Sequence, residues 1–454
     1  MPHTARIALN RPIRRLFDYL VPNGMALAPG QRVAVPFGRT TATGLVVDLD
    51  VTPPAGITLK TILNQCEPWP ALPTETFRLL GWASNYYQHP LGECLFTALP
   101  PALRRGQSAS IPKEIYWKAV AGSTGLPANA SRQKALLEWL QRLPGGASAR
   151  HILQAGFSHG QIRSLGHKQM IVETEPPAAK TTPDITVDGP LLSQAQSEAA
   201  RQLPAPGEGF STTLLYGITG SGKTEIYLDY LKRNLGTSSQ ALVLVPEINL
   251  TPQTVARFEH YFGKRVAVWH SALNDSQRLR TWLQIREGEP VILIGTRSAV
   301  LLPYTRLGTI IVDEEHDSSY KQGEGFRYSG RDTAVYRGSL NQCPVILGSA
   351  TPSLESILNT QNGKYRLVKL EQRAGSAILP TIKLLDIRSR PLQSGFSRPA
   401  LDAIRRALGS GQQALVYVNR RGFAPVMMCF DCGHMVECPR CDTRLTFHRR
   451  DNAM

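Results

Sequence analysis

The central part of the chain carries short unbroken runs of apolar residues that alternate with amphipathic stretches. Strands that are buried on both faces of a parallel sheet have this pattern, because neither face meets water. We therefore predict a parallel α/β sheet after about residue 190, with helices between its strands. The predicted strands include residues Thr213–Tyr216, Ala241–Val245, Val291–Ile294, Thr309–Val312 and Val345–Leu347.

The residues before this sheet have two other patterns. Residues 1–105 show short strands separated by Gly and Pro, then a helix near Thr74–Tyr87, which predicts a small β-rich module. Residues 106–178 are mainly helical, with a helix, turn and helix across Ala149–Leu165 and a final strand, which predicts a winged-helix domain. A proline-rich linker follows.

The predicted domains are therefore 1–105, 106–178, the parallel-sheet lobe 179–369 and a last section 370–454. The apolar run Ala414–Val418 predicts the first strand of a second sheet of the same kind. At 454 residues the chain is too long for one hydrophobic core, which agrees with several domains.

Composition narrows the class of protein. The chain has 51 Lys and Arg against 35 Asp and Glu, a net charge of +16, which favours a polyanionic partner such as nucleic acid. Charge alone is weak evidence, so a motif must decide. No apolar run is long enough to cross a bilayer and no secretory signal begins the chain, so we expect a cytoplasmic protein without a membrane partner.

A phosphate-binding loop connects the first predicted strand of the sheet to a helix. Glycines at positions 217, 220 and 222 allow backbone N–H groups to face phosphates at the start of a helix. We expect Lys223 to neutralise the β- and γ-phosphates of ATP and Thr224 to bind Mg²⁺. A chance glycine-rich turn would lack the flanking strand and helix. The candidate ATP-binding residues of this loop are Gly217, Gly220, Gly222, Lys223 and Thr224.

Two carboxylates follow the predicted strand Thr309–Val312. A P-loop enzyme needs a carboxylate for Mg²⁺ and a base for the attacking water, both at the end of a neighbouring strand. Asp313 is placed for the first role and Glu314 for the second, so the catalytic candidates are Lys223, Asp313 and Glu314.

Three further loops follow predicted strands of the same sheet, at residues 245–254, 295–299 and 348–352. Each could be an ordinary βα loop, but their order together with the P-loop and the acidic motif resembles superfamily 2 DNA helicases. The resemblance implies a RecA-like helicase lobe, in which Gln196 is placed like the glutamine that reads adenine. After the acidic motif, aromatic and cationic residues alternate, which suits single-stranded DNA. The candidates there are Tyr320, Phe326, Arg327 and Tyr328.

The run DEEHDSSYKQ, the segment NRRGFAP, a cysteine cluster and the N-terminal segments 17–19 and 35–38 together resemble the PriA family of replication-restart helicases. The resemblance implies an ATP-dependent 3′-to-5′ DNA helicase of the primosome that recognises stalled forks and acts as a monomer. Its partners would be branched and single-stranded DNA, other primosome proteins and single-stranded DNA-binding protein, the last through Trp82 and Tyr86. The residues that would bind a 3′-terminal nucleotide are Phe17, Asp18, Gly38 and Lys60.

The cysteine cluster predicts zinc. Two CxxC pairs have the spacing of thiolate knuckles, which favours a metal over disulfides in a reducing compartment. Five residues separate the pairs, fewer than the roughly 15 to 20 of a zinc ribbon, so each pair could belong to a different site. The resemblance implies two zinc ions per complete protein. The candidate ligands are Cys429, Cys432, Cys438 and Cys441.

The last section is too short for a complete second helicase lobe, so we expect a chain truncated at its C-terminal end. A motor of this kind binds ATP between two lobes, which makes hydrolysis by this chain doubtful. The alternative function is a fork-binding adaptor without motor activity.

Overall fold

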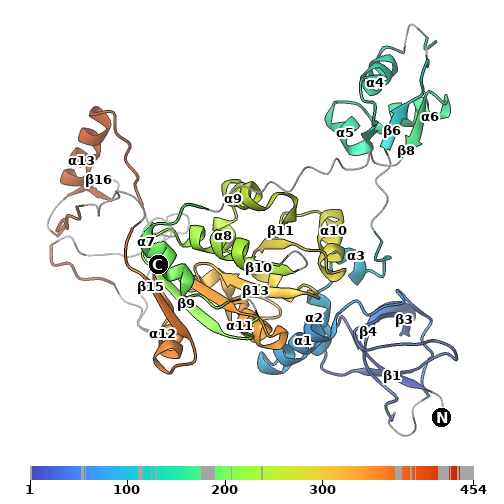
Figure 1. Cartoon of the computed structure of the whole chain (residues 1–454), viewed down its shortest axis with the longest axis horizontal. Coiled ribbons are helices and arrows are strands. Elements are labelled where there is room, and N and C mark those ends of the chain that lie inside the picture. The colour runs from blue at the N-terminus through green and yellow to red at the C-terminus, as the bar shows by residue number, and fades with distance from the viewer. Residues whose placement is uncertain are drawn as a thin grey trace. The chain divides into compact units, whose positions relative to one another are not determined.

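The computed structural model divides into two compact units, Met1–Ser376 and Ala377–Met454. Within them the structure describes residues 3–52, 56, 58–110, 116–123, 125–127, 130–174, 190–205, 207–236, 239–373, 381–388, 391–393, 395–417, 429, 431–436 and 439. Figure 1 shows the elements along the chain. None of the helices in these ranges is both long and apolar enough to cross a membrane.

An antiparallel sheet of five strands forms the beginning of the first unit, in the order β2-β1-β4-β3-β5. Its core is made of small and branched residues such as Ile7, Val33 and Val46. A Cβ on Gly92 would lie 1.9 Å from the Leu9 carbonyl oxygen, so helix α2 (Leu91–Thr97) can pack on strand β1 only with glycine at this position. The strands are β1 (Thr4–Leu9), β2 (Phe17–Leu20), β3 (Arg32–Phe37), β4 (Thr40–Leu49) and β5 (Asn64–Gln65).

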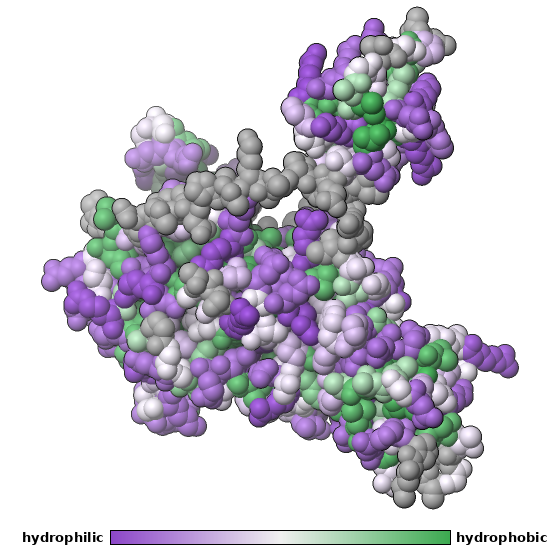
Figure 2. All heavy atoms as spheres, turned by 45° about the vertical axis from the view of Figure 1, so that its right-hand side comes forward, coloured by the Kyte–Doolittle hydropathy of each residue, from purple (hydrophilic) through white to green (hydrophobic). Residues whose placement is uncertain are grey.

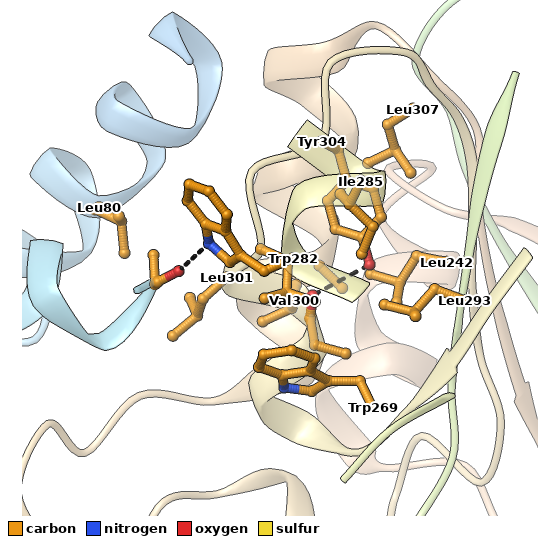
Figure 3. Close-up of a cluster of buried hydrophobic side chains, with 14 of the residues drawn as sticks. Leu80, Leu242, Trp269, Trp282, Ile285, Leu293, Val300, Leu301, Tyr304 and Leu307 are labelled. Atoms are coloured by element: carbon orange, nitrogen blue, oxygen red, sulfur yellow. Dashed lines mark hydrogen bonds between the residues drawn. The ribbon is translucent and has the colours of Figure 1, made fainter. Parts of the chain in front are cut away.

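Three helices connect this sheet to the lobe: α1 (Thr74–Tyr86), α2 (Leu91–Thr97) and α3 (Pro101–Arg104). Helix α1 confirms the helix predicted near residues 74–87. The buried indole of Trp282, from the lobe, donates a hydrogen bond of 2.8 Å to the Ala98 carbonyl oxygen. Figure 3 shows this indole between the connecting helices and the lobe, with Leu80 directed toward it. The connecting helices therefore share one core with the lobe.

Residues 116–174 form a small α/β region with its own core, in which Leu136, Ile152 and Leu165 are buried. A capping box at Ser158 and Gln161 begins α6, as expected for a side chain that satisfies free N–H groups. Strands β7, β6 and β8 pair antiparallel in that order. The elements are β6 (Tyr116–Ala119), α4 (Ser131–Gln141), β7 (Ala147–Ser148), α5 (Ala149–Gln154), α6 (His159–His167) and β8 (Ile171–Thr174). Most of the predicted linker lies outside the described residues.

The lobe is a parallel sheet of seven strands in the order β11-β12-β10-β13-β14-β9-β15. The five predicted strands are confirmed as β9, β10, β12, β13 and β14. The bounds are β9 (Thr212–Gly217), β10 (Gln240–Leu244), β11 (Val266–Trp269), β12 (Ile292–Gly295), β13 (Leu307–Val312), β14 (Val345–Ser349) and β15 (Arg366–Leu370).

Side chains of the central strands alternate between two buried cores, one on each face of the sheet. Leu242 and Leu244 belong to one core, and Val243, between them, belongs to the other. Figure 1 shows α8 and α9 on one side of the sheet and α11 on the other. This burial on both faces explains the unbroken apolar runs. The helices are α7 (Gln194–Arg201), α8 (Lys223–Asn234), α9 (Pro252–Phe262), α10 (Asp275–Arg286), α11 (Gly330–Asn341) and α12 (Leu354–Gln361), with 3₁₀ turns η1 (Glu247–Asn249), η2 (Gly263–Arg265), η3 (Arg297–Leu301) and η4 (Ser318–Tyr320).

The second unit contains, among its described residues, a short hairpin of β16 (Leu392–Gln393) and β17 (Phe396–Ser397) and the helix α13 (Arg398–Gly409). The strand predicted at 414–418 is wrong for the described residues 414–417, which form no strand. Leu415 is 97% exposed and Tyr417 83% exposed. An apolar run becomes a strand only when neighbouring strands pair with it and cover it, and the described part of this unit provides none beside it.

The surface is mixed in polarity. Figure 2 shows hydrophilic side chains interspersed with small hydrophobic areas over the face in view. Sites in this chain must therefore be recognised by the residues that line a particular cavity.

Candidate functional site

The P-loop lies between strand β9 and helix α8. Gly222 precedes the helix with a φ of +81°, and Gly220 has a φ of +78°, conformations that favour glycine. A Cβ at Gly222 would lie 2.3 Å from the Gln196 side-chain nitrogen. The free N–H groups at the start of α8 face the loop and give this end of the helix its affinity for anions.

Gln196 supports this loop. Its Nε2 donates a 2.9 Å hydrogen bond to the Ser221 carbonyl oxygen, and its Oε1 accepts a 2.8 Å bond from the backbone N–H of Ser193. The side chain is buried, and Ser193 also caps helix α7. One donor and one acceptor are therefore engaged with backbone atoms. Contact with adenine stays a prediction, because the amide still has one further hydrogen and one further lone pair.

Lys223 is the first residue of α8, and its side chain is only 9% exposed. Its ammonium donates a 3.1 Å hydrogen bond to the Gly217 carbonyl oxygen and lies 3.6 Å from the nearer carboxylate oxygen of Glu314. The structure thus brings together two catalytic candidates that are 91 positions apart in the sequence, counting from residue 223 to residue 314. The ammonium lies beside the loop in which phosphates would bind.

Asp313 follows strand β13 and accepts a 2.9 Å hydrogen bond from the Tyr227 hydroxyl on its Oδ1. Burial raises the pKa of this carboxyl, and the neighbouring charge of Glu314 raises it further. Thr224 and Asp313 line one cavity of about 380 Å³. Hydroxyl and carboxylate oxygens are ligands that Mg²⁺ takes, so these two residues fit the metal.

The rest of the acidic motif is tied to two other segments. Glu315 is buried and accepts hydrogen bonds from Ser353, Ser356 and Arg331, at 2.7–3.1 Å. His316 lies 2.7 Å from the Ser349 hydroxyl through its Nδ1. The motif is therefore linked to the ends of strand β14 and helices α11 and α12. Sequence reasoning missed Glu315 and Arg331, because adjacent charges in a sequence give no sign of which one is buried.

The aromatic segment differs from the expectation. Tyr320, Phe326 and Tyr328 are 3–6% exposed, whereas Arg327 is exposed. Phe326 packs against Tyr328, with ring centroids 4.8 Å apart, and its ring stacks with that of His89 at 5.4 Å. In this conformation the three rings offer no open face to a base. Their contact with DNA stays a prediction, and it requires this segment to move.

Tyr320 contacts the nucleotide site. Its hydroxyl donates a 2.6 Å hydrogen bond to the Asp313 carbonyl oxygen. Arg297 holds the same segment by donating to the carbonyl oxygens of Ser319 and Lys321, at 2.6 and 2.7 Å. The segment is therefore attached to the acidic motif on one side and to the loop after β12 on the other.

A second cavity lies in the N-terminal sheet and has a volume of about 520 Å³. All four residues predicted for the 3′-terminal nucleotide line it, namely Phe17, Asp18, Gly38 and Lys60. Sequence reasoning missed Arg6 and Arg15 of the lining, because they resemble ordinary surface charges in the sequence. The remaining lining residues are Arg6, Arg15, Leu16, Tyr19, Pro36, Phe37, Thr58 and Leu59.

The walls of this second cavity, called the end pocket from here on, combine aromatic rings and cations. The rings of Phe17 and Phe37 meet edge to face, with centroids 5.2 Å apart, and the Arg15 guanidinium lies 5.8 Å from the Phe17 centroid. Asp18 forms a two-pronged ion pair with Arg6, at 2.9 and 3.3 Å, and its hydrogen bond raises the pKa of that guanidinium. The pocket therefore offers a stacking surface, cations and one carboxylate.

Only part of the predicted zinc site is described. Cys438 and Cys441 lie outside the described residues. Cys429 and Cys432 are exposed, and the backbone N–H of Cys432 lowers the pKa of the Cys429 thiol by donating to it. Across the described part of the chain, no group of three or more His, Cys, Asp or Glu residues is placed to hold a metal ion.

Two family models match the parts of the chain that contain these sites. Residues 6–100 match the family model described as the 3′DNA-binding domain (3′BD), and residues 193–360 match that of the DEAD/DEAH box helicases. Among solved structures, RecG bound to a three-way DNA junction is 24% identical, with a TM-score of 0.32, over 41% of this chain and 25% of RecG. The Pyrococcus furiosus Hef helicase domain is 16% identical, with a TM-score of 0.30, over 39% of this chain and 38% of Hef. Scores this low add nothing to the assignment.

The parallel sheet, with the P-loop and the acidic motif at the ends of its strands, is typical of a RecA-like helicase lobe of the DEAD/DEAH box class. The relatives narrow this class. Replication restart protein PriA of Haemophilus influenzae is 41% identical over 99% of this chain and 63% of its own length, and that of Chlamydia pneumoniae is 36% identical over 99% and 62%. The Bacillus subtilis protein is 31% identical over 96% and 64%. The chain belongs to the PriA family, and it spans slightly less than two thirds of the length of these relatives.

Proposed function

We propose that this chain is the DNA-end-binding and ATP-binding part of a 3′-to-5′ DNA helicase of the primosome, which recognises stalled or collapsed forks and restarts replication. The observation that carries the proposal is the convergence of Lys223, Thr224, Asp313 and Glu314 at the carboxyl edge of the parallel sheet. Ligands bind at that edge in open α/β folds. Family membership supports the same reaction.

The roles of these residues follow from their placement. Lys223, held between a loop carbonyl and Glu314, exchanges both contacts for the β- and γ-phosphates of ATP. Glu314 then accepts a proton from the attacking water. Thr224 and Asp313 hold Mg²⁺, which when bound neutralises charge on the phosphates. Gln196 holds the loop through its hydrogen bond to the Ser221 carbonyl oxygen. Its remaining amide hydrogen and lone pair contact adenine.

DNA-stimulated phosphate release tests this proposal on residues 1–454. We expect magnesium-dependent nucleotide binding that is lost in Lys223→Ala and kept in Glu314→Gln, and any phosphate release should be lost in both variants. Tight binding to forked DNA without any nucleotide binding would instead favour the fork-binding adaptor.

The end pocket binds the 3′-terminal nucleotide of DNA in this proposal. Phe17 stacks on the terminal base, Arg6, Arg15 and Lys60 attract phosphates, and Asp18 accepts a hydrogen bond from the 3′-hydroxyl. Gly38 leaves its wall open, since no atom lies within 4 Å of the position a Cβ would take. A 3′-phosphate would place negative charge beside Asp18, which would disfavour it. Competition between 3′-hydroxyl and 3′-phosphate oligonucleotides tests this discrimination.

Residues 106–178 serve as a winged-helix DNA-binding domain in this proposal, and 179–369 as the first helicase lobe. The support is the order β6-α4-β7-α5-α6-β8, in which α5 and α6 form a helix-turn-helix beside a small antiparallel sheet.

Residues 370–454 begin the second lobe and contribute Cys429, Cys432, Cys438 and Cys441 to zinc sites. Zinc content measured on purified protein, with and without these cysteines, tests the last point.

A partner site for the tail of single-stranded DNA-binding protein completes the proposal. Tyr86 is 64% exposed, and the Trp82 ring stacks between it and Tyr336, with centroids 5.0 and 3.9 Å apart. An exposed aromatic stack of this kind fits an apolar peptide end. Loss of peptide binding in Tyr86→Ala, measured by fluorescence anisotropy, is the expected result. Unchanged binding in this variant would rule the site out.

The likeness to the family also supports two further parts of the proposal, namely other primosome proteins as partners and a cytoplasmic location.

A further inference from the structure

Tyr227 is buried beside the predicted nucleotide site, although it is not one of the predicted site residues. Tyr227 lies one turn after Lys223 in helix α8 and is 1% exposed. Its hydroxyl donates a 2.9 Å hydrogen bond to Oδ1 of Asp313, which comes from strand β13. A side chain of the P-loop helix thus reaches the carboxylate of the acidic motif directly.

The neighbouring strand leaves room for this hydroxyl. A Cβ on Gly348 would lie 1.6 Å from the Tyr227 hydroxyl oxygen and 2.9 Å from the ring carbon that carries it. The same Cβ would lie 3.5 Å from Oδ1 of Asp313. Any side chain on Gly348 would therefore displace the tyrosine from the carboxylate, which gives a physical reason for glycine at this position of β14.

The other atoms of Asp313 are also fixed. Its backbone N–H donates a 2.9 Å hydrogen bond to the Leu244 carbonyl oxygen, and its own carbonyl oxygen accepts the bond from Tyr320. With the main chain held in this way, the carboxylate can still rotate about its last torsion, which has a broad energy minimum. The Tyr227 hydroxyl, together with the backbone N–H of Glu314, favours one orientation of the carboxylate.

We propose that Tyr227 is a positioning residue of the magnesium–nucleotide site: its hydroxyl orients the Asp313 carboxylate for the metal, and Gly348 provides the space for that hydroxyl. This inference rests on the proposed ATP-binding function. Tyr227 does not touch the nucleotide in this arrangement. It acts through Asp313, so its removal changes metal affinity more than it changes the binding of ATP without metal.

The test uses a fluorescent ATP analogue bound to residues 1–454 while the concentration of Mg²⁺ is varied. Tyr227→Phe removes one oxygen atom and keeps the ring. We expect the Mg²⁺ concentration for half-maximal binding to rise about 10- to 150-fold, since a hydrogen bond to a charged group is lost. Nucleotide binding in the presence of a chelator should stay unchanged. Tyr230→Phe is the matched control, because Tyr230 is an equally buried tyrosine of the same helix.

A second variant checks the role of the glycine. Gly348→Ala should raise the Mg²⁺ requirement by a similar factor, and it should raise it less in the Tyr227→Phe background, where the hydroxyl has already gone. Equal Mg²⁺ requirements for Tyr227→Phe, Tyr230→Phe and the wild type would overturn the inference and leave the proposed function intact. Absence of magnesium-dependent nucleotide binding by the wild type would overturn the proposed function itself.

Discussion

In the lobe, the site residues come from the ends of neighbouring parallel strands, whereas in the N-terminal sheet they come from an edge strand, a turn and the segment 58–60. The lobe site is internally connected, with Lys223 beside Glu314 and Tyr227 bonded to Asp313. In the end pocket Asp18 is paired with Arg6, and the exposed Lys60 donates a 3.4 Å hydrogen bond to the Gly38 carbonyl oxygen, while Arg15 is exposed beside Phe17. A connected, buried site suits a reaction that needs fixed geometry, and an open cationic pocket suits capture of a charged chain end.

The difference also affects how each site depends on the rest of the fold. Displacement of one strand in the lobe would move several catalytic groups together. The end pocket depends on local structure, above all on the pairing of β1 with β2 and on the β3–β4 turn. The two sites should therefore respond separately to substitutions, and the following predictions test that separation.

The largest effect is expected for Lys223→Ala. Loss of the ammonium should lower ATP turnover by on the order of 10³-fold, comparable to the loss of another cation that stabilises transferring phosphates. Binding to a 3′ DNA end should change less than twofold. Phosphate release and fluorescence anisotropy measure the two activities. Lys364→Ala, which removes an exposed lysine of the same lobe, serves as the control and should leave both unchanged. A matching loss of end binding in Lys223→Ala would show that the sites are not separate.

The next effect concerns the stability of the N-terminal sheet. Arg32 and Glu67 form a buried two-pronged ion pair, and Arg32 also donates to the carbonyl oxygen of Leu103 and, at 2.8 Å, to that of Gln107. Arg32→Met leaves the Glu67 carboxylate buried without its partner, which should cost roughly 3–5 kcal/mol of local unfolding free energy. Hydrogen exchange of strands β3 and β4 measures this cost.

The double variant Arg32→Met with Glu67→Leu should recover much of that free energy, because no charge is then left unpaired. Nucleotide binding by the lobe should remain in both variants. If the exchange of β9 and β13 accelerated as much as that of β3 and β4, the N-terminal sheet would not be an independently stable region.

The residues of the two sites could be predicted from the sequence to different extents. Lys223 and Asp313 were found because a glycine-rich loop and buried strands have regular patterns, and the parallel sheet then places the strand ends together. Tyr227 was not found, because a tyrosine in an amphipathic helix carries no sign that its hydroxyl meets a carboxylate. Phe326 was expected to be open to DNA, yet a buried aromatic loop has the same alternation of rings and cations. The residues of the end pocket came from family likeness alone.

A smaller effect is expected in the end pocket. Phe17→Ala should weaken binding to a 3′-hydroxyl DNA end by about 1–3 kcal/mol, the range for the loss of one stacked base. Asp18→Asn should reduce the preference for a 3′-hydroxyl over a 3′-phosphate, since it removes the repelling charge. Asp48→Asn is the matched control, because Asp48 is an exposed carboxylate of the same sheet, on strand β4, and does not line the pocket. Equal preferences in Asp18→Asn and the wild type would count against the role of Asp18.

The smallest effect concerns one of the contacts between the connecting helices and the lobe. The Thr76 hydroxyl of α1 accepts a 2.9 Å hydrogen bond from Arg337 of α11, a fully buried arginine whose guanidinium also donates to the Val300 carbonyl oxygen. Burial lowers the pKa of this guanidinium to about 10, which still leaves it charged at neutral pH, so it needs its acceptors.

Thr76→Val keeps the shape of the side chain and removes the acceptor. We expect a loss of about 1–2 kcal/mol in the local unfolding free energy of α1 and α11, because a buried donor is left without its partner. Thr97→Val, which removes only a hydroxyl bonded to its own helix, should cost less. Hydrogen exchange of both helices provides the measurement. Since Arg337 belongs to the lobe and Thr76 to the connecting helices, faster exchange in both helices would show that the two regions share stability although their sites act separately. Faster exchange in α1 alone would show that the connecting helices and the lobe do not share stability.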